Sequence, residues 1–128
     1  LPVKIVLLNN GVHGMVRQWQ DLFYEGRYSA SILGTLPDFV KLADAYGIPG
    51  LRAVKPAEVE PVLKEGLKQK GPVLMDIHTD PYENCYPMIP AGGAQHQMML
   101  EDPPELKVAK KGGAHKRKVD EGEGVLPA

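Results

Sequence analysis

The sequence contains one cysteine, one tryptophan and two phenylalanines among its 128 residues. A single thiol cannot form an internal disulfide, which suits a reducing compartment without establishing one. The chain also lacks an excess of charge of either sign, because 15 basic residues face 16 acidic ones and the formal net charge is −1. We therefore expect no nucleic-acid partner. No apolar run approaches the roughly 20 residues that span a bilayer and no signal peptide is present, so we expect no membrane association.

The hydrophobic content of 43% and the charged content of 24% are ordinary for a globular domain. Apolar residues alternate between strand-like runs and helical periods, and this alternation predicts an α/β fold with a parallel sheet. Val73–Ile77 is typical of a buried strand, and the nearly continuous apolar run from Val3 to Leu8 predicts a strand covered on both faces. The expected order is a strand at 3–8, a helix at 15–23, a helix between Thr35 and Gly47, a strand at 51–54, a helix from Pro56 to Gly71, and a strand at 73–77.

Two of these helices carry predicted boundaries and inward faces. Thr35 and Asp38 have the spacing of a capping box, and Gly47 is placed to end the helix that follows them. The apolar spacing of this helix places its inward face at Phe39, Leu42, Ala43 and Tyr46. The inward face of the helix that begins at Pro56 is predicted at Val59, Leu63 and Leu67.

The first strand ends in Asn9-Asn10-Gly11, which has two interpretations. Asn-Gly after apolar residues is a strong hairpin signal. The residues that follow instead have a helical period, since Met15, Val16, Trp19, Leu22 and Phe23 share one side. The polar residues on the opposite side are Arg17, Gln18, Gln20 and Asp21. We therefore predict a strand, a tight loop and a helix.

A strand, a loop and a helix N-terminus together form a common binding place for anionic cofactors. The amide oxygen of Asn10 could also hold a hard cation that bridges phosphates, although asparagine is equally a turn former. Asn9 has the same two roles open, with the structural one favoured. His13 could approach a phosphate or be a surface residue, and Met15, Val16 and Trp19 could simply be core.

Further along the chain, several segments match the order and spacing of one enzyme family. They are Pro2–Trp19, Gly14–Trp19, Leu36–Ala43, Gly71–Leu74 and Glu83–Gly92. The first resembles the Asn-Asn half of the thiamine diphosphate motif, in the form found in the large catalytic subunit of acetolactate synthase. The resemblance covers residues 1 to about 100. It implies the carboxyl-terminal part of a parallel-sheet, Rossmann-like domain that binds thiamine diphosphate.

The Gly-Asp-Gly half of that motif, whose Asp supplies a metal ligand in the family, occurs nowhere in the chain. We therefore expect a carboxyl-terminal piece that lacks the family's catalytic glutamate and its FAD-binding domain, so that no catalytic residue is assigned here. The resemblance implies an enzyme that decarboxylates pyruvate and condenses the product with a second 2-ketoacid in valine, leucine and isoleucine biosynthesis. It also implies Mg²⁺ as a cofactor, FAD in the intact protein, a homodimer or tetramer, and a regulatory subunit. The isolated chain is expected to be inactive.

The resemblance also assigns residue roles. The cofactor-binding residues it implies are Asn9, Asn10, Gly11, Val12, His13, Gly14, Met15 and Val16. Within this set, Mg²⁺ is held by the Asn10 side chain and the Val12 backbone carbonyl. Trp19, Ala91 and Gly92 belong to the substrate channel, although a proline-rich loop would also explain the last two. Asp76, Asp80 and Glu83 fit no metal motif, and a strand end with a solvated turn explains them.

Two other interpretations stay open at this stage. Another thiamine diphosphate-dependent ketoacid decarboxylase or oxidase could share the strand-Asn-Asn junction, and a non-catalytic fragment could act only as a subunit-interaction module. We divide the chain into a domain at 1–100 and a charged, disordered tail at 101–128. The compartment stays open: cytoplasmic for a bacterial protein, plastid or mitochondrion for a eukaryotic one.

Overall fold

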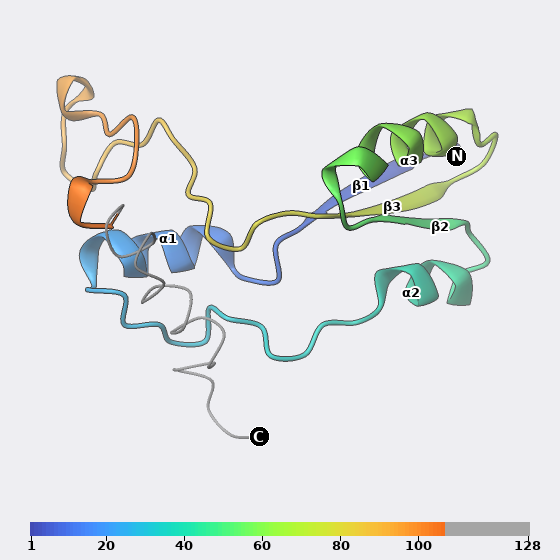
Figure 1. The fold of residues 1–128 in the computed structure, drawn as a ribbon, viewed down its shortest axis with the longest axis horizontal. Helices are drawn as coiled ribbons and strands as arrows, with labels where there is room; N and C mark the ends of the chain where they lie inside the picture. Colours follow the sequence, from blue (N-terminus) through green and yellow to red (C-terminus); the bar gives the residue numbers. More distant parts are fainter. Residues whose placement is uncertain (107–128) are drawn as a thin grey trace. The chain divides into compact units, whose positions relative to one another are not determined.

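The computed structural model describes residues 1–106, and the chain divides into two compact units. The first consists of residues 1–10 and 35–80, and the second of residues 11–34 and the chain from Pro81 onward. The elements follow one another in the predicted order (Figure 1). They are β1 (Lys4–Asn9), α1 (Gly14–Phe23), α2 (Phe39–Ala45), β2 (Gly50–Ala53), α3 (Pro56–Lys68), β3 (Val73–His78) and the short 3₁₀ helix η1 (Gln95–Gln97).

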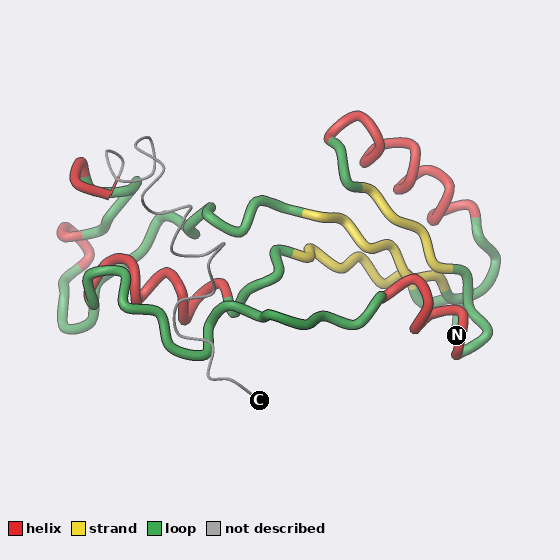
Figure 2. The backbone as a smooth tube through the Cα atoms, turned by 60° about the horizontal axis from the view of Figure 1, so that its bottom comes forward, coloured by secondary structure: helices red, strands yellow, loops and turns green. Residues whose placement is uncertain are grey.

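The first unit is built on a three-stranded parallel sheet with the order β1-β3-β2, which confirms the predicted sheet type. The central strand is β3, and the side chains from Val73 to Ile77 are all buried. Helices α2 and α3 both pack on β2 and β3, and they lie on opposite faces of the sheet (Figure 2). This double cover explains why β3 has a continuous apolar sequence apart from Asp76.

Helix α3 closes the main hydrophobic core. Val73, Met75 and Ile77 alternate along β3 and face α3, together with Ala53 of β2. Leu51, Val59, Val62 and Leu63 pack against this cluster. The prediction for α3 is confirmed at Val59 and Leu63 and wrong at Leu67, whose side chain is 66% exposed. Val62 takes the inward place instead because it follows Val59 by three residues, within the same helical stripe.

Helix α2 begins at Phe39, so the predicted start near Thr35 is wrong. Asp38 is itself the N-cap, and its carboxylate accepts hydrogen bonds from the Val40 and Lys41 amides. Arg52 donates to the same carboxylate, and this contact with the guanidinium lowers the pKa of Asp38 from its ordinary value.

The C-terminal end of α2 is confirmed. Gly47 has a φ of 69°, and the Ile48 amide returns to the Ala43 carbonyl at 3.1 Å. The predicted inward face of α2 is confirmed at Ala43, which is 1% exposed. It is wrong at Leu42, which is 41% exposed, and at Tyr46, which is 78% exposed because it is the C-cap residue, already outside the last helical turn.

The expected burial of β1 on both faces is wrong. Ile5, Val6 and Leu8 are 43%, 47% and 67% exposed, because β1 lies at the edge of the sheet while α2 and α3 cover β2 and β3. The strand is nevertheless held firmly at its start. The Lys4 ammonium donates to the backbone carbonyls of Gln69 and Gly71, the second at 2.7 Å.

The second unit contains α1 and two long loops. The segment before α1 is fixed by an antiparallel bridge between Val12 and Ile32, and a similar bridge joins Met88 to Met99. As predicted, residues 79–100 hold little regular structure beyond η1. None of the helices within residues 1–106 has the length and hydrophobicity that crossing a bilayer requires. Most of the predicted tail, residues 107–128, lies outside the described part of the chain.

Candidate functional site

The predicted cofactor residues begin at the carboxyl end of β1, in the first unit. Asn9 is the last residue of the strand, and its side-chain amide donates to the buried carboxylate of Asp76 at 3.0 Å. Its backbone carbonyl accepts from the Thr79 amide at 2.9 Å. Asn9 is therefore a structural residue that orients the strand end, as the sequence favoured. Asn10 follows it and is half-buried.

Asp76 is the residue that sequence reasoning misjudged here. It is fully buried in β3 instead of lying in a solvated turn. Its carboxylate accepts from Asn9 Nδ2 and from Arg52 Nε, each at 3.0 Å, and lies 3.4 Å from His78 Nε2. A buried carboxylate is stable only when such donors surround it. Asp76 therefore acts as a fixed anchor for the strand end that precedes Asn10.

The second unit begins with the Gly11–Gly14 loop, which leads into α1. Gly11 has a φ of 70°, a conformation that favours glycine, and its carbonyl accepts from the Leu33 amide at 3.2 Å. Val12 is buried, and the His13 amide donates to the Ser31 carbonyl at 2.8 Å. The loop is therefore held in one conformation before the helix starts.

The N-terminus of α1 lacks the usual side-chain cap. His13 is the N-cap and is exposed, and its side chain makes no capping hydrogen bond. The first turn of the helix contains no acidic residue. A ten-residue helix with this arrangement has a positive dipole end, and no side-chain cap accepts from its first backbone amides. These features fit an anionic group such as a diphosphate.

The alternative interpretation of Met15, Val16 and Trp19 as core residues is wrong, because the apolar side of α1 is exposed. Met15, Val16, Trp19 and Phe23 are between 37% and 53% exposed, whereas Arg17 and Gln18 are 0% and 1% exposed. The polar side chains are buried because residues 83–85 of the second unit provide hydrogen-bond acceptors for them. The helical period was read correctly, but the side that faces the protein is the polar one.

The exposed apolar side of α1 lines a surface pocket of about 570 Å³. Its lining residues are Met15, Val16, Trp19, Gln20, Tyr24, Arg27 and Ser29. Trp19 packs edge-to-face on Phe23, with 5.3 Å between ring centroids, and this contact favours one orientation of the indole. The structure thus brings Met15, Val16 and Trp19 of the predicted site together. Sequence reasoning missed Tyr24, Arg27 and Ser29, because they follow the regular part of the helix.

The two remaining predicted residues, Ala91 and Gly92, are exposed in a turn of the second unit. Gly92 has a φ of 76°, and the following Gly93 amide donates to the Pro90 carbonyl at 2.9 Å. They are not among the residues that line the pocket beside Trp19. Their assignment to a channel stays a prediction.

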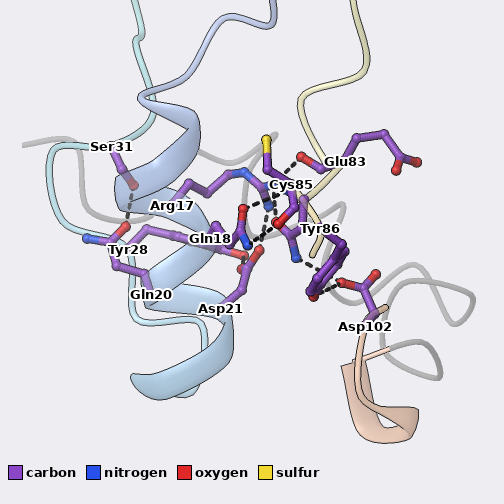
Figure 3. A network of polar contacts seen from close by, with 11 residues as sticks. Arg17, Gln18, Gln20, Asp21, Tyr28, Ser31, Glu83, Cys85, Tyr86 and Asp102 are labelled. Atoms are coloured by element: carbon purple, nitrogen blue, oxygen red, sulfur yellow. Dashed lines mark hydrogen bonds and ion pairs between the residues drawn. The ribbon is translucent and has the colours of Figure 1, made fainter. Parts of the chain in front are cut away.

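The polar side of α1 belongs to a network of polar contacts within the second unit (Figure 3). The Tyr28 hydroxyl donates to the Asp21 carboxylate, and burial together with this contact raises the pKa of Tyr28 far above its ordinary value. The Tyr86 hydroxyl donates to Asp102 at 2.8 Å, and burial with this contact raises the pKa of Tyr86 to about 12. Both phenols therefore stay protonated at neutral pH and act as hydrogen-bond donors.

A metal held by residues 1–106 would need ligands other than a carboxylate or histidine cluster. Within residues 1–106, no group of three or more His, Cys, Asp or Glu side chains is arranged to hold a metal ion. An amide oxygen and a backbone carbonyl, as at Asn10 and Val12, are donors that Mg²⁺ accepts, with phosphate oxygens and water in the other positions. An asparagine amide oxygen and a backbone carbonyl are therefore residue types that fit a magnesium ion bound together with a phosphate group.

A parallel α/β sheet followed in the chain by a helix with an uncapped N-terminus is typical of domains that bind phosphorylated cofactors. Residues 1–77 match the family model described as the thiamine pyrophosphate enzyme, C-terminal TPP binding domain, and the chain belongs to this family. A solved structure supports the same fold. It is the thiamine diphosphate-dependent 4-hydroxybenzoylformate decarboxylase of Rhodococcus jostii RHA1, with a TM-score of 0.53 and 30% identity, over 62% of this chain and 15% of that one.

Curated relatives are more similar in sequence. The acetolactate synthase large subunit of Haemophilus influenzae is 46% identical over 106 residues, which cover 82% of this chain and 18% of that protein. The mitochondrial acetolactate synthase of Schizosaccharomyces pombe is 50% identical over 102 residues, covering 80% of this chain and 15% of that protein. This chain therefore spans less than a fifth of the length of these relatives.

Proposed function

We propose that this chain is the carboxyl-terminal cofactor-binding part of an acetolactate synthase catalytic subunit. The observation that carries this proposal is the 44–50% identity to proteins of that name over most of the chain. The intact enzyme would decarboxylate pyruvate and join the product to a second 2-ketoacid, giving acetolactate or acetohydroxybutyrate. These are the first products specific to branched-chain amino acid synthesis.

The diphosphate end of the cofactor is the part that this chain would hold. Asn10 Oδ1 and the Val12 carbonyl would be Mg²⁺ ligands, and the first turn of α1 would donate backbone amides to phosphate oxygens. Asn9 would keep Asn10 in place through its contact with Asp76. When bound, thiamine diphosphate supplies the nucleophilic carbon and accepts the electron pair released with carbon dioxide. None of the residues in this chain is assigned a proton-transfer role.

The substrate side would be formed by the exposed face of α1. Met15 and Val16 would adjoin the cofactor, and Trp19 would form a wall of the channel, with Ala91 and Gly92 at its mouth. The indole is partly exposed on an apolar pocket and is held by Phe23, so it can restrict the size of an acyl chain. Such a wall discriminates between ketoacids that differ by one methylene by about 1–3 kcal/mol.

The intact protein would contain more than this chain. We propose that the catalytic glutamate, the remaining metal ligand and the FAD-binding domain lie in other parts of it, as the family resemblance implies. The partners proposed are a second catalytic subunit, in a dimer or tetramer, and a regulatory subunit. The relatives include bacterial and mitochondrial proteins, so the proposed compartment is either a bacterial cytoplasm or a eukaryotic organelle.

A second candidate is a thiamine diphosphate-dependent 2-ketoacid decarboxylase. The observation in its favour is the structural similarity to the Rhodococcus enzyme. That similarity has 30% identity, against 46% and 50% for the acetolactate synthases. The two functions differ in the fate of the decarboxylated product, which is released as an aldehyde or joined to a second ketoacid.

The test uses the Haemophilus influenzae large subunit with its matching segment replaced by residues 1–106 of this chain. We expect this chimera, with pyruvate, Mg²⁺ and thiamine diphosphate, to form acetolactate. Formation of acetaldehyde alone would favour the decarboxylase, and loss of both reactions would contradict the cofactor role. The isolated 128-residue chain should show no turnover.

Asn10→Ala in the chimera tests the metal site. The concentration of Mg²⁺ needed for half-maximal activity should rise about tenfold or more, because a contact with a charged group contributes roughly 1.5–3 kcal/mol. Gln69→Ala, on the exposed end of α3, is the control and should leave the Mg²⁺ requirement unchanged. An equal Mg²⁺ requirement in the two variants would show that Asn10 is not a metal ligand.

A further inference from the structure

The polar side of α1 is buried, and its side chains contact one distant loop. Arg17 and Gln18 are 0% and 1% exposed, and both reach the same short stretch of backbone, residues 83–85 (Figure 3). These positions are separated by 66 or 67 residues in the sequence. The contacts therefore join the helix to a distant loop of the same unit.

Gln18 uses both ends of its amide on one residue. Its Nε2 donates to the Cys85 carbonyl at 2.9 Å, and its Oε1 accepts from the Cys85 amide at 2.7 Å. The side chain thus pairs with the loop as a neighbouring strand would. Gln18 Nε2 also lies 3.1 Å from Met88 Sδ. An amide buried in this way fixes its partner in distance and orientation, because neither end has water as a substitute.

Arg17 extends the same attachment to the two loop residues that precede Cys85. Its guanidinium donates to the Glu83 carbonyl at 3.2 Å and to the Asn84 side chain at 2.7 Å, and it pairs with Asp21 at 2.5 Å. Asn84 in turn donates to Asp102 at 2.9 Å. Consecutive residues of α1 therefore hold consecutive residues of the loop.

The loop leads from this attachment directly to the predicted channel mouth. Met88 lies beside Gln18 and is bridged to Met99 by two backbone hydrogen bonds, of 2.8 and 2.9 Å. Ala91 and Gly92 follow three and four residues after Met88. Trp19 is the residue after Gln18 on the helix. The buried amide of Gln18 is thus adjacent in sequence to Trp19, the proposed channel wall. It also holds the loop that contains Ala91 and Gly92, the proposed channel mouth.

We propose that Gln18, assisted by Arg17, is a positioning residue for substrate selection. It holds the 83–92 loop on α1 and thereby sets the position of Ala91 and Gly92 relative to Trp19. This inference rests on the proposed function only for its consequence in catalysis. Gln18 touches neither cofactor nor substrate, and it acts through the loop. It determines how the second 2-ketoacid is accepted and leaves the metal site alone.

The attachment itself is tested by amide hydrogen exchange in the full 128-residue chain. Gln18→Met keeps the side-chain volume and removes both hydrogen bonds, so the Cys85 amide should exchange about tenfold faster. The His13 amide, which donates to Ser31 in the same unit, should stay protected and reports that the unit is folded. Gln18→Asn has a shorter side chain whose amide cannot reach Cys85. The Cys85 amide should therefore exchange faster in this variant too, although residue 18 stays polar. Gln20→Met is the control, since Gln20 contacts Ser29 and Ser31 instead of the loop.

The catalytic consequence is tested in the chimera described above. Gln18→Met should raise the KM for the second ketoacid and change the acetolactate to acetohydroxybutyrate ratio by about threefold or more, with a smaller effect on kcat. The Mg²⁺ requirement should be unchanged, which separates this variant from Asn10→Ala. Gln69→Met should alter neither quantity.

The outcomes separate the two proposals. Unchanged exchange at Cys85 in both Gln18 variants would overturn the attachment. Faster exchange with an unchanged product ratio would overturn the positioning role. A chimera that is inactive even with Gln18 in place would contradict the proposed function, and the exchange result on the full chain would still decide whether Gln18 holds the loop.

Discussion

The side-chain amide of Asn9 donates a hydrogen bond to the carboxylate of Asp76, 3.0 Å away across the β1–β3 pair. Leu7 is the register partner of Asp76, so Asn9 reaches it diagonally along the same face of the sheet. This contact joins an exposed edge strand to a fully buried charge. It places the end of β1 by a side-chain interaction, whereas α2 and α3 pack on β2 and β3.

We expect Asp76→Ala to destabilise the chain by about 1–3 kcal/mol, the usual cost of removing a partner from buried polar groups. The donors that lose their acceptor are Asn9 and Arg52, each 3.0 Å from the carboxylate. Urea unfolding of the full chain, followed by circular dichroism, measures the change. Asp44→Ala, at an exposed position of α2, is the control. Equal midpoints for the two variants would show that Asp76 is not an anchor.

Gly50 is required by the approach of β2 to α2. A Cβ added to Gly50 would lie 2.9 Å from both the Cα and the carbonyl oxygen of Val40. Since these are backbone atoms, Gly50→Ala should cost about 1–3 kcal/mol of unfolding free energy through overpacking. Gly71→Ala meets nothing within 4 Å and is the matched control. A thermal midpoint for Gly50→Ala equal to that of the control would contradict this packing.

Alkaline pH should destabilise the second unit through its buried phenols. The pKa values of Tyr28 and Tyr86 are raised above the ordinary value of 10.0, to about 12 for Tyr86. The folded chain therefore holds these protons more tightly than the unfolded chain. The stability they contribute is complete below pH 10, and it falls as the pH rises through about 12, where the folded Tyr86 ionises.

Denaturation midpoints at pH 8 and at pH 11 measure this effect. The original chain should lose more stability between these two values than the Tyr28→Phe and Tyr86→Phe variants, which have no proton to release. Tyr46→Phe removes an exposed hydroxyl and should behave as the original chain does. An identical pH dependence in all four proteins would rule out a contribution from the two buried phenols.

Trp19 should control the size of the second substrate. Trp19→Leu enlarges the pocket beside α1, and discrimination between pyruvate and 2-ketobutyrate in the chimera should change by about tenfold or more. Competition between the two ketoacids, read from the product ratio, is the measurement. Tyr46→Leu removes an exposed aromatic side chain of the first unit and should leave the ratio as it was. A Trp19→Leu enzyme with unchanged selectivity would exclude the indole from the channel wall.

Much of the fold could be predicted because it depends on short-range patterns. The apolar run at Val73–Ile77, the glycine at position 47 and the proline at position 56 predicted a buried strand, a helix end and a helix start, and all three are confirmed. Each depends on local backbone preference or on burial of the strand itself. The Asn10–Gly14 loop could be proposed as a cofactor site because its residue types and order resemble a known motif.

The rest required three dimensions, and α1 shows why. The sequence determined that residues 14–23 form a helix with one polar and one apolar side, since a period of 3.6 residues is a property of the chain alone. Only the tertiary structure decided that the polar side is the buried one, because Arg17 and Gln18 also donate to acceptors on residues more than 60 positions away. The same holds for Asp76, whose donors lie on two other strands. Periodicity divides a helix into faces, but the hydrogen-bond partners that distant segments supply determine which face is covered.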